Sequence, residues 1–188
     1  MTVSTALLLV DIQNDYFPGG KMELENSVAA GLQAQRLLTV FRENRWPLVH
    51  IQHVALGPGA TFFLPGTEGA EVHACVRPLK SETVLQKHYP NAFRETPLLR
   101  HLEGQAIQQL VVVGMMTHMC IDATTRAASD HGYQCVVAHD ACATRALQFG
   151  DQRVPASAVH GAFLAALEDA YAQVMTAEEV LTALSQKS

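Results

Sequence analysis

A cysteine stands where an apolar strand runs into a helix, a position that suits a nucleophile. Residues 110–113 are Leu-Val-Val-Val and precede Gly114, which predicts a buried parallel strand that stops at the glycine. Residues 120–128 follow a helical pattern, so Cys120 lies in or near a first helical turn. Unpaired N–H groups and the helix dipole favour an anion there, which biases the thiol toward thiolate. The alternative is that Cys120 is a small buried apolar residue.

Two charged residues follow other predicted strands. Asp11 ends the apolar run 6–10, and Lys87 ends the run 83–86. Ligands of open parallel sheets bind beyond the carboxyl ends of the strands, so Asp11, Lys87 and Cys120 are expected at one rim. There the acid can accept the thiol proton, while the ammonium stabilises negative charge. Taken singly, Asp11 is more often only a turn or cap residue, and Lys87 more often only a solvated loop lysine. Lys80 is the rival candidate for the functional lysine, but it lies in a polar stretch and not at a strand end.

The elements that position these residues alternate along the chain. Strands are predicted at 6–10, 48–51, 83–86, 110–114, 134–138 and 172–175, and helices at 27–44, 96–103, 120–128, 157–169 and after the capping box 176–179. Residues 54–82 are rich in glycine and proline and are expected to form a long functional loop. This alternation predicts an α/β fold of three layers (αβα, Rossmann-like), whose mostly parallel six-stranded sheet carries helices on both faces.

Composition excludes several classes of function. The 188 residues carry a net charge of −5 without a basic block, so no nucleic-acid surface is expected. The sequence contains no signal-peptide pattern and no apolar stretch long enough to span a bilayer, so no membrane partner is expected. The four cysteines have no CxxC pairing and no zinc-ligand spacing, which favours reduced thiols and a cytoplasmic location.

Several segments together resemble the isochorismatase-like cysteine hydrolases, a family that includes nicotinamidase, N-carbamoylsarcosine amidase and streptothricin hydrolase. The matching segments are residues 9–17 (LVDIQNDYF), 85–87 with 91–93 and Thr96, 113–122 (VGMMTHMCID), 139–143 and 159–160. The resemblance covers nearly the whole chain, and its most specific part surrounds Cys120. It implies one hydrolase domain spanning residues 1–188 and a homodimer or homotetramer.

The resemblance also implies roles for individual residues. Asp11, Lys87 and Cys120 form its catalytic triad, and the peptide bond between Met115 and Met116 is cis. The backbone N–H groups of Met116 and Cys120 form an oxyanion hole. The predicted reaction is attack of the Cys120 sulfur on a small non-peptide amide or related C–N bond, followed by hydrolysis of a thioester.

Two other functions stay open at this point. Cleavage of a vinyl ether, the isochorismatase reaction, needs an acid such as Asp11 but no nucleophile. The third possibility is a catalytically silent protein that binds a small molecule on the same scaffold.

Other residues near the rim could line the pocket. Nicotinamidases carry an Asp-x-His metal pair after the second strand, but here residues 51–53 are Ile-Gln-His, so neither a metal nor another cofactor is expected. His53 is a candidate pocket residue, and the imidazoles of His53 and His73 without a carboxylate are only weak evidence for a metal. Phe17, Phe62 and Phe63 are expected to be exposed loop aromatics that contact the substrate, with residues 62–66 as a candidate lid.

Overall fold

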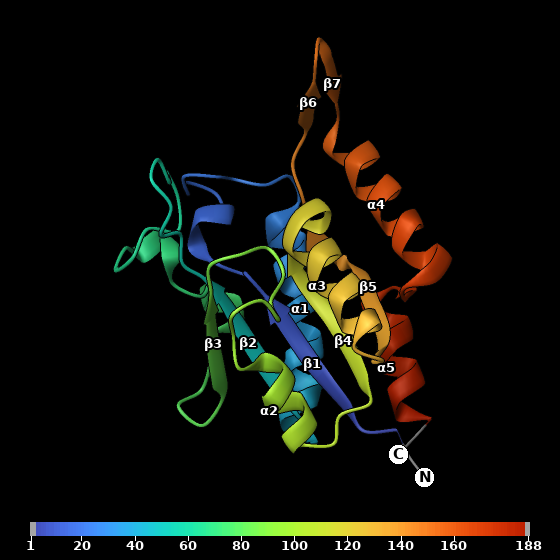
Figure 1. Ribbon diagram of the computed structural model, residues 1–188. Coiled ribbons are helices and arrows are strands. Elements are labelled where there is room, and N and C mark those ends of the chain that lie inside the picture. The colour runs from blue at the N-terminus through green and yellow to red at the C-terminus, as the bar shows by residue number, and fades with distance from the viewer. Residues whose placement is uncertain (1–2, 187–188) are drawn as a thin grey trace.

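Figure 1 shows the computed structural model, which describes residues 3–186. Six parallel strands form one sheet in the order β3-β2-β1-β4-β5-β8. The strands are β1 (Thr5–Val10), β2 (Leu48–His53), β3 (Thr83–Lys87), β4 (Gln109–Met115), β5 (Gln134–Ala143) and β8 (Gln173–Met175). The predicted six-stranded parallel sheet is confirmed. The predicted domain limits, 1 and 188, lie outside the described residues.

Helices cover both faces of this sheet. One face carries α1 (Ser27–Glu43) and α5 (Ala177–Ser185), and the other carries α2 (Leu98–Gly104), α3 (Asp122–Asp130) and α4 (Ala156–Ala170). The central strand β1 feeds both cores, because Leu7 and Leu9 face one layer while Leu8 and Val10 face the other. The predicted three-layer architecture is therefore confirmed, and the Thr176 capping box opens α5 as expected.

Two local features differ from the prediction. The α-helix was expected to begin at Cys120. Cys120 instead lies in a π-helical turn, Thr117–Ile121, and α3 begins at Asp122. A hairpin of β6 (Leu147–Phe149) and β7 (Gln152–Val154) was not expected, and Figure 1 shows it projecting beyond the body of the molecule. Its strands have three residues each, too few to produce a clear alternating pattern.

The long loop 54–82 is fastened to the segment that follows β1. It contains two short 3₁₀ helices, Glu68–Ala70 and Ala74–Val76. Gln13, which is fully buried, donates from Nε2 to the carbonyls of Ala70 (2.7 Å) and His53 (2.8 Å). The carboxylate of Asp15 accepts from the backbone N–H of Phe63 at 2.7 Å. Buried polar groups thus attach this loop at Phe63 and Ala70 to the segment that follows β1.

Strands β1 and β4 lie side by side where the strand order changes direction, which is the usual ligand position of such sheets. Gly114 pairs with Val10 at the carboxyl end of these strands. Its φ is +126°, and a Cβ at this position would overlap the Val10 carbonyl oxygen. Only glycine lets the two strands approach this closely immediately before Asp11.

We predict that Gly114→Ala lowers the free energy of unfolding by at least about 2 kcal/mol, because it adds both backbone strain and overlap with Val10. The matched control is Gly104→Ala at the end of α2, where a Cβ meets no atom within 4 Å. The control should stay within about 1 kcal/mol of the parent. Urea unfolding measures both changes, and equal stability of the two variants would contradict the argument.

Candidate active site

The structure brings Asp11, Lys87 and Cys120 together. Lys87 Nζ lies 2.6 Å from Asp11 Oδ2 and 3.2 Å from Cys120 Sγ. The exposed fractions are 0% for Asp11, 1% for Lys87 and 5% for Cys120. Asp11 follows β1, Lys87 ends β3, and Cys120 lies in the turn after β4, so all three come from carboxyl ends of strands. The three side chains therefore lie together at one rim of the sheet, as expected. Their catalytic roles stay a prediction.

His53 completes the surroundings of the Lys87 ammonium. It pairs with Lys87 in the register of β2 and β3, so both side chains lie on the same face of the sheet. Its Nδ1 lies 2.9 Å from Lys87 Nζ. A lysine ammonium has three N–H donors and no acceptor, so Nδ1 must accept here. The three donors of Lys87 therefore have three partners, in Asp11, His53 and Cys120.

Asp11 is held in an unusual backbone conformation between Lys87 and Cys120. Its φ is +51°, in the left-handed region that residues other than glycine seldom occupy, although aspartate tolerates it better than most. Its N–H donates to the Ile51 carbonyl at 3.0 Å, which ties it to β2. Both carboxylate oxygens are buried; Oδ2 lies 2.6 Å from Lys87 Nζ, and the carboxylate also lies within hydrogen-bonding reach of the Cys120 thiol. The carboxylate is therefore placed to accept the thiol proton.

The electrostatics of the cluster favour a charged lysine and a protonated thiol. Burial acts to lower the pKa of Lys87, but the charges of Asp11 and Cys120 outweigh it and raise this pKa. Burial, and after it the Asp11 carboxylate, raises the pKa of Cys120 well above its ordinary value, although Lys87 opposes them. Burial and the Asp11 carboxylate thus act against the bias toward thiolate that the sequence predicted for Cys120.

The cluster resembles a metal-ligand set, yet its centre is taken by an ammonium. Asp11, His53 and Cys120 each have one possible ligand atom, and these three atoms lie within 4.8 Å of one another. Lys87 Nζ contacts all three residues, so its positive charge stands where a metal ion would have to lie. Ile51 is a buried apolar residue at the position of the nicotinamidase carboxylate. These residues do not fit a metal centre of the nicotinamidase kind.

Three of the predicted pocket residues differ from expectation in their exposure. Phe17 and Phe63 are buried (3% and 1% exposed) and Phe62 is half-buried, so the prediction of exposed loop aromatics is wrong. Phe17 stacks on the imidazole of His73 with ring centroids 3.6 Å apart, which also places His73 against an aromatic ring. Phe63 packs on Tyr16 at 4.6 Å and lies 6.0 Å from the His53 ring. Of these three phenylalanines, Phe63 has its ring beside that of His53.

Sequence analysis missed two residues beside the site. Gln13 accepts from the His53 N–H at 2.7 Å as well as donating to the His53 carbonyl, so it fixes that residue's backbone. Tyr16 is buried, and burial together with the charges of Cys120 and Asp11 raises its pKa well above the ordinary value. Both follow Asp11 closely in the sequence. Their types alone could not tell a buried anchor from a solvated loop residue.

The turn between β4 and Cys120 is tightly wound. The Met115–Met116 peptide bond is cis. The Met116 carbonyl accepts from the N–H groups of Met119 (3.0 Å) and Ile121 (3.2 Å). This turn places Cys120 beside Lys87 and Asp11. An oxyanion hole formed by the Met116 and Cys120 N–H groups stays a prediction.

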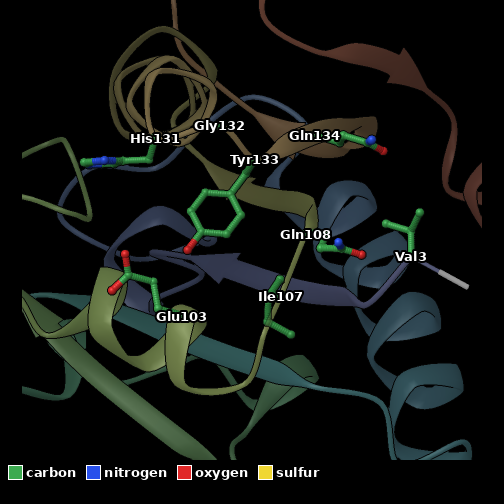
Figure 2. Close-up of a pocket in the computed structure, with 8 residues that line it drawn as sticks. All are labelled: Val3, Glu103, Ile107, Gln108, His131, Gly132, Tyr133 and Gln134. Carbon is green, nitrogen blue, oxygen red and sulfur yellow. The ribbon is translucent and has the colours of Figure 1, made fainter. Parts of the chain in front are cut away.

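A separate cavity of about 410 Å³ lies at the other end of the strands, where β4 and β5 begin. Figure 2 shows that it is bounded by Gln108, just before β4, and Gln134, the first residue of β5, with Tyr133 and Glu103 across from them. Its lining comes from the amino ends of these strands and includes none of the predicted site residues. The candidate active site is therefore the Asp11, Lys87 and Cys120 cluster.

Known proteins match this chain over nearly its whole length. The isochorismatase domain family matches residues 5–179. YddQ, an uncharacterised isochorismatase family protein of Bacillus subtilis, is 54% identical over 179 residues, which cover 95% of this chain and 99% of that protein. Maleamate amidohydrolase of Pseudomonas putida is 29% identical over 193 residues, covering 95% and 86% of the two chains. The crystal structure of an Oleispira antarctica protein assigned as an isochorismatase hydrolase gives a TM-score of 0.92 at 50% identity, covering 97% of this chain and 98% of that one.

We predict that iodoacetamide alkylates Cys120 at a rate that keeps rising with pH beyond 9, the ordinary pKa of a thiol, because burial and Asp11 raise this pKa. Asp11→Asn removes the carboxylate charge and should move the rise to lower pH. Peptide mass spectrometry of alkylated protein across pH measures both profiles. A plateau below pH 9 in the parent, or an upward shift in Asp11→Asn, would contradict the assignment.

We predict that Lys87→Met lowers the free energy of unfolding by about 3–5 kcal/mol, because it leaves the Asp11 carboxylate buried without its cation. Adding Asp11→Asn to Lys87→Met should then recover part of the loss. A double-mutant cycle by urea unfolding measures the coupling, expected at about 1 kcal/mol or more. Strict additivity of the two substitutions would show that the pair does not interact.

Proposed function

The chain belongs to the isochorismatase family, whose relatives with named activities include amidohydrolases, and on that basis we propose that it is a cysteine-dependent hydrolase of a small non-peptide amide or related C–N bond. One observation carries the proposal. The ammonium of Lys87 contacts both the Asp11 carboxylate and the Cys120 sulfur in a buried site. An acid, a cation and a thiol in this geometry are the groups that acyl transfer to sulfur requires.

The proposed reaction begins with a proton transfer. Asp11 accepts the thiol proton as the Cys120 sulfur forms a bond to the carbonyl carbon of the substrate. The carbonyl oxygen becomes an oxyanion, which the N–H groups of Met116 and Cys120 stabilise. The C–N bond then breaks, and protonated Asp11 donates its proton to the leaving amine. The product of this half-reaction is a thioester on Cys120.

The second half-reaction returns the site to its starting state. Asp11 accepts a proton from a water molecule, whose oxygen attacks the thioester carbonyl. The C–S bond breaks, the carboxylic acid leaves, and the sulfur regains its proton from Asp11. The thiol proton leaves on the amine and the water proton replaces it on the sulfur, each by way of Asp11, so the charge around Lys87 is nearly the same before and after the cycle. A protonated resting thiol is compatible with this scheme, because Asp11 removes the proton only when a carbonyl is in place.

Two alternatives lead to different observations. Vinyl ether cleavage of the isochorismatase kind uses the acid but leaves the sulfur without a role, so loss of Cys120 would spare it. A silent binding protein would turn over nothing. The buried contact between Lys87 and the Cys120 sulfur favours the amidohydrolase, because neither alternative requires a cation beside that sulfur.

The remaining predictions complete the proposal. We infer that residues 1–188 form one hydrolase domain and that Phe63 and His53 border the substrate. No helix within residues 3–186 is both long and apolar enough to cross a membrane. A cytoplasmic location and association into a homodimer or homotetramer stay predictions.

We predict that Cys120→Ala lowers ammonia release from the best substrate by at least roughly a thousandfold, because the acyl acceptor is removed. The screen covers small amides, ureas and lactams. Cys135→Ala is the matched control, since this thiol is also buried but accepts no hydrogen bond from Lys87. The control should keep most of the activity.

The outcome of this comparison separates the candidates. Equal activity of Cys120→Ala and the parent on an amide would refute the thioester route. Activity on isochorismate that survives Cys120→Ala would favour vinyl ether cleavage. No turnover of any compound in the screen would favour the binding protein.

A further inference from the structure

The Lys87 ammonium has a third partner for which the proposed reaction provides no role. Asp11 and Cys120 exchange the proton, whereas His53 only accepts from Lys87, at 2.9 Å. Asp11, Lys87 and Cys120 are at most 5% exposed, while His53 is half-buried, so it forms the outer edge of the cluster. A group in this position controls where the ammonium points.

The structure fixes His53 more firmly than a pocket side chain requires. Gln13 bonds both its backbone N–H (2.7 Å) and its carbonyl (2.8 Å), and the register of β2 and β3 places it directly beside Lys87. Phe63 lies against the ring. His53 therefore presents Nδ1 to Lys87 from a rigid strand end.

We propose that His53 is a positioning residue for this reaction: its neutral imidazole accepts one N–H of Lys87 through Nδ1 and so directs the other two at Asp11 and Cys120. The inference rests on the proposed function, because directing those bonds matters only if the sulfur and the carboxylate react. With Nδ1 as the acceptor, the neutral ring carries its proton on Nε2.

Physical chemistry supports this role on two counts. An ammonium with only two acceptors would rotate between them and leave one buried N–H unsatisfied, which is unfavourable. A third fixed acceptor removes that freedom. A protonated His53 could not accept, and it would place a second positive charge beside Lys87.

Burial and the charge of Lys87 both favour the neutral form of His53. Burial, followed by the charge of Lys87, lowers its pKa to about 4, with a smaller lowering from His88, while Asp11 acts in the opposite direction. Nδ1 is therefore available as an acceptor at neutral pH. Below about pH 4 the acceptor is lost.

Two substitutions distinguish a role through Nδ1 of His53 from a role through Nε2. His53→Asn places an amide oxygen near the position of Nδ1, so it can still accept from Lys87. His53→Gln places its amide near the position of Nε2 and removes the Nδ1 acceptor. A role through Nδ1 predicts that asparagine rescues function and glutamine does not.

The readout uses the full-length protein and needs no substrate. Iodoacetamide alkylation of Cys120, followed across pH by peptide mass spectrometry, reports how well Lys87 stabilises the thiolate. We expect alkylation in His53→Gln to be slower by roughly tenfold, the size of effect typical for a hydrogen bond to a charged group. His53→Asn should stay close to the parent, and kcat for the best amide should follow the same order with little change in KM.

A second measurement covers the case in which the variants fail to fold. Long-range ¹⁵N NMR of the histidine side chains in the unmodified protein assigns the tautomer of His53 at neutral pH. The proposal requires the Nε2–H form, and the Nδ1–H form or an imidazolium would overturn it.

Other outcomes are equally decisive. Parent-like alkylation in His53→Gln would overturn the proposal, and so would an equal loss in folded His53→Asn and His53→Gln. If alkylation follows the expected order but the parent hydrolyses no amide, the role of His53 stands and the proposed function fails.

Discussion

The structure depends on one buried cation. The Lys87 ammonium is almost fully removed from water, which is costly unless each of its N–H groups finds an acceptor. Three strand ends supply these acceptors: Asp11 from β1, His53 from β2 and Cys120 from the turn after β4. The parallel order of the sheet brings these ends together, and Gly114 lets β4 approach β1 closely at that point. The strand order that forms the sheet therefore also places the acceptors around Lys87.

The same burial also raises the pKa of the Cys120 thiol. Removal from water and the nearby carboxylate raise the pKa of Cys120, which favours a thiol beside a proton acceptor in the resting site. A permanently ionised thiolate would react with any electrophile that entered. Proton transfer to Asp11 when a carbonyl is present confines the reactive form to the moment of reaction. The nearby Lys87 charge opposes the cost of forming that anion.

Much of the fold and part of the site could be predicted from the sequence. The apolar runs that end at Asp11, Lys87 and Gly114 predicted three strands of the sheet. Parallel topology then placed the ends of these strands at a common rim. The roles of Phe17 and Phe63 could not be predicted, since loop aromatics look alike whether buried or exposed. The contact of His53 with Lys87 depends on the register of β2 and β3, which no local pattern specifies. The raised pKa of Cys120 comes first from burial, which depends on residues distant in the sequence and is not visible in the local pattern around a helix start.

The most direct test of this account is the state of the Lys87 side chain in solution. ¹⁵N NMR of the lysine side chains can separate Lys87 from the exposed Lys21 and Lys80. The account predicts a charged, slowly exchanging Lys87 ammonium at neutral pH whose resonance shifts when Cys120 is alkylated. A neutral amine, or an ammonium that exchanges as fast as that of Lys21 and ignores Cys120, would contradict it.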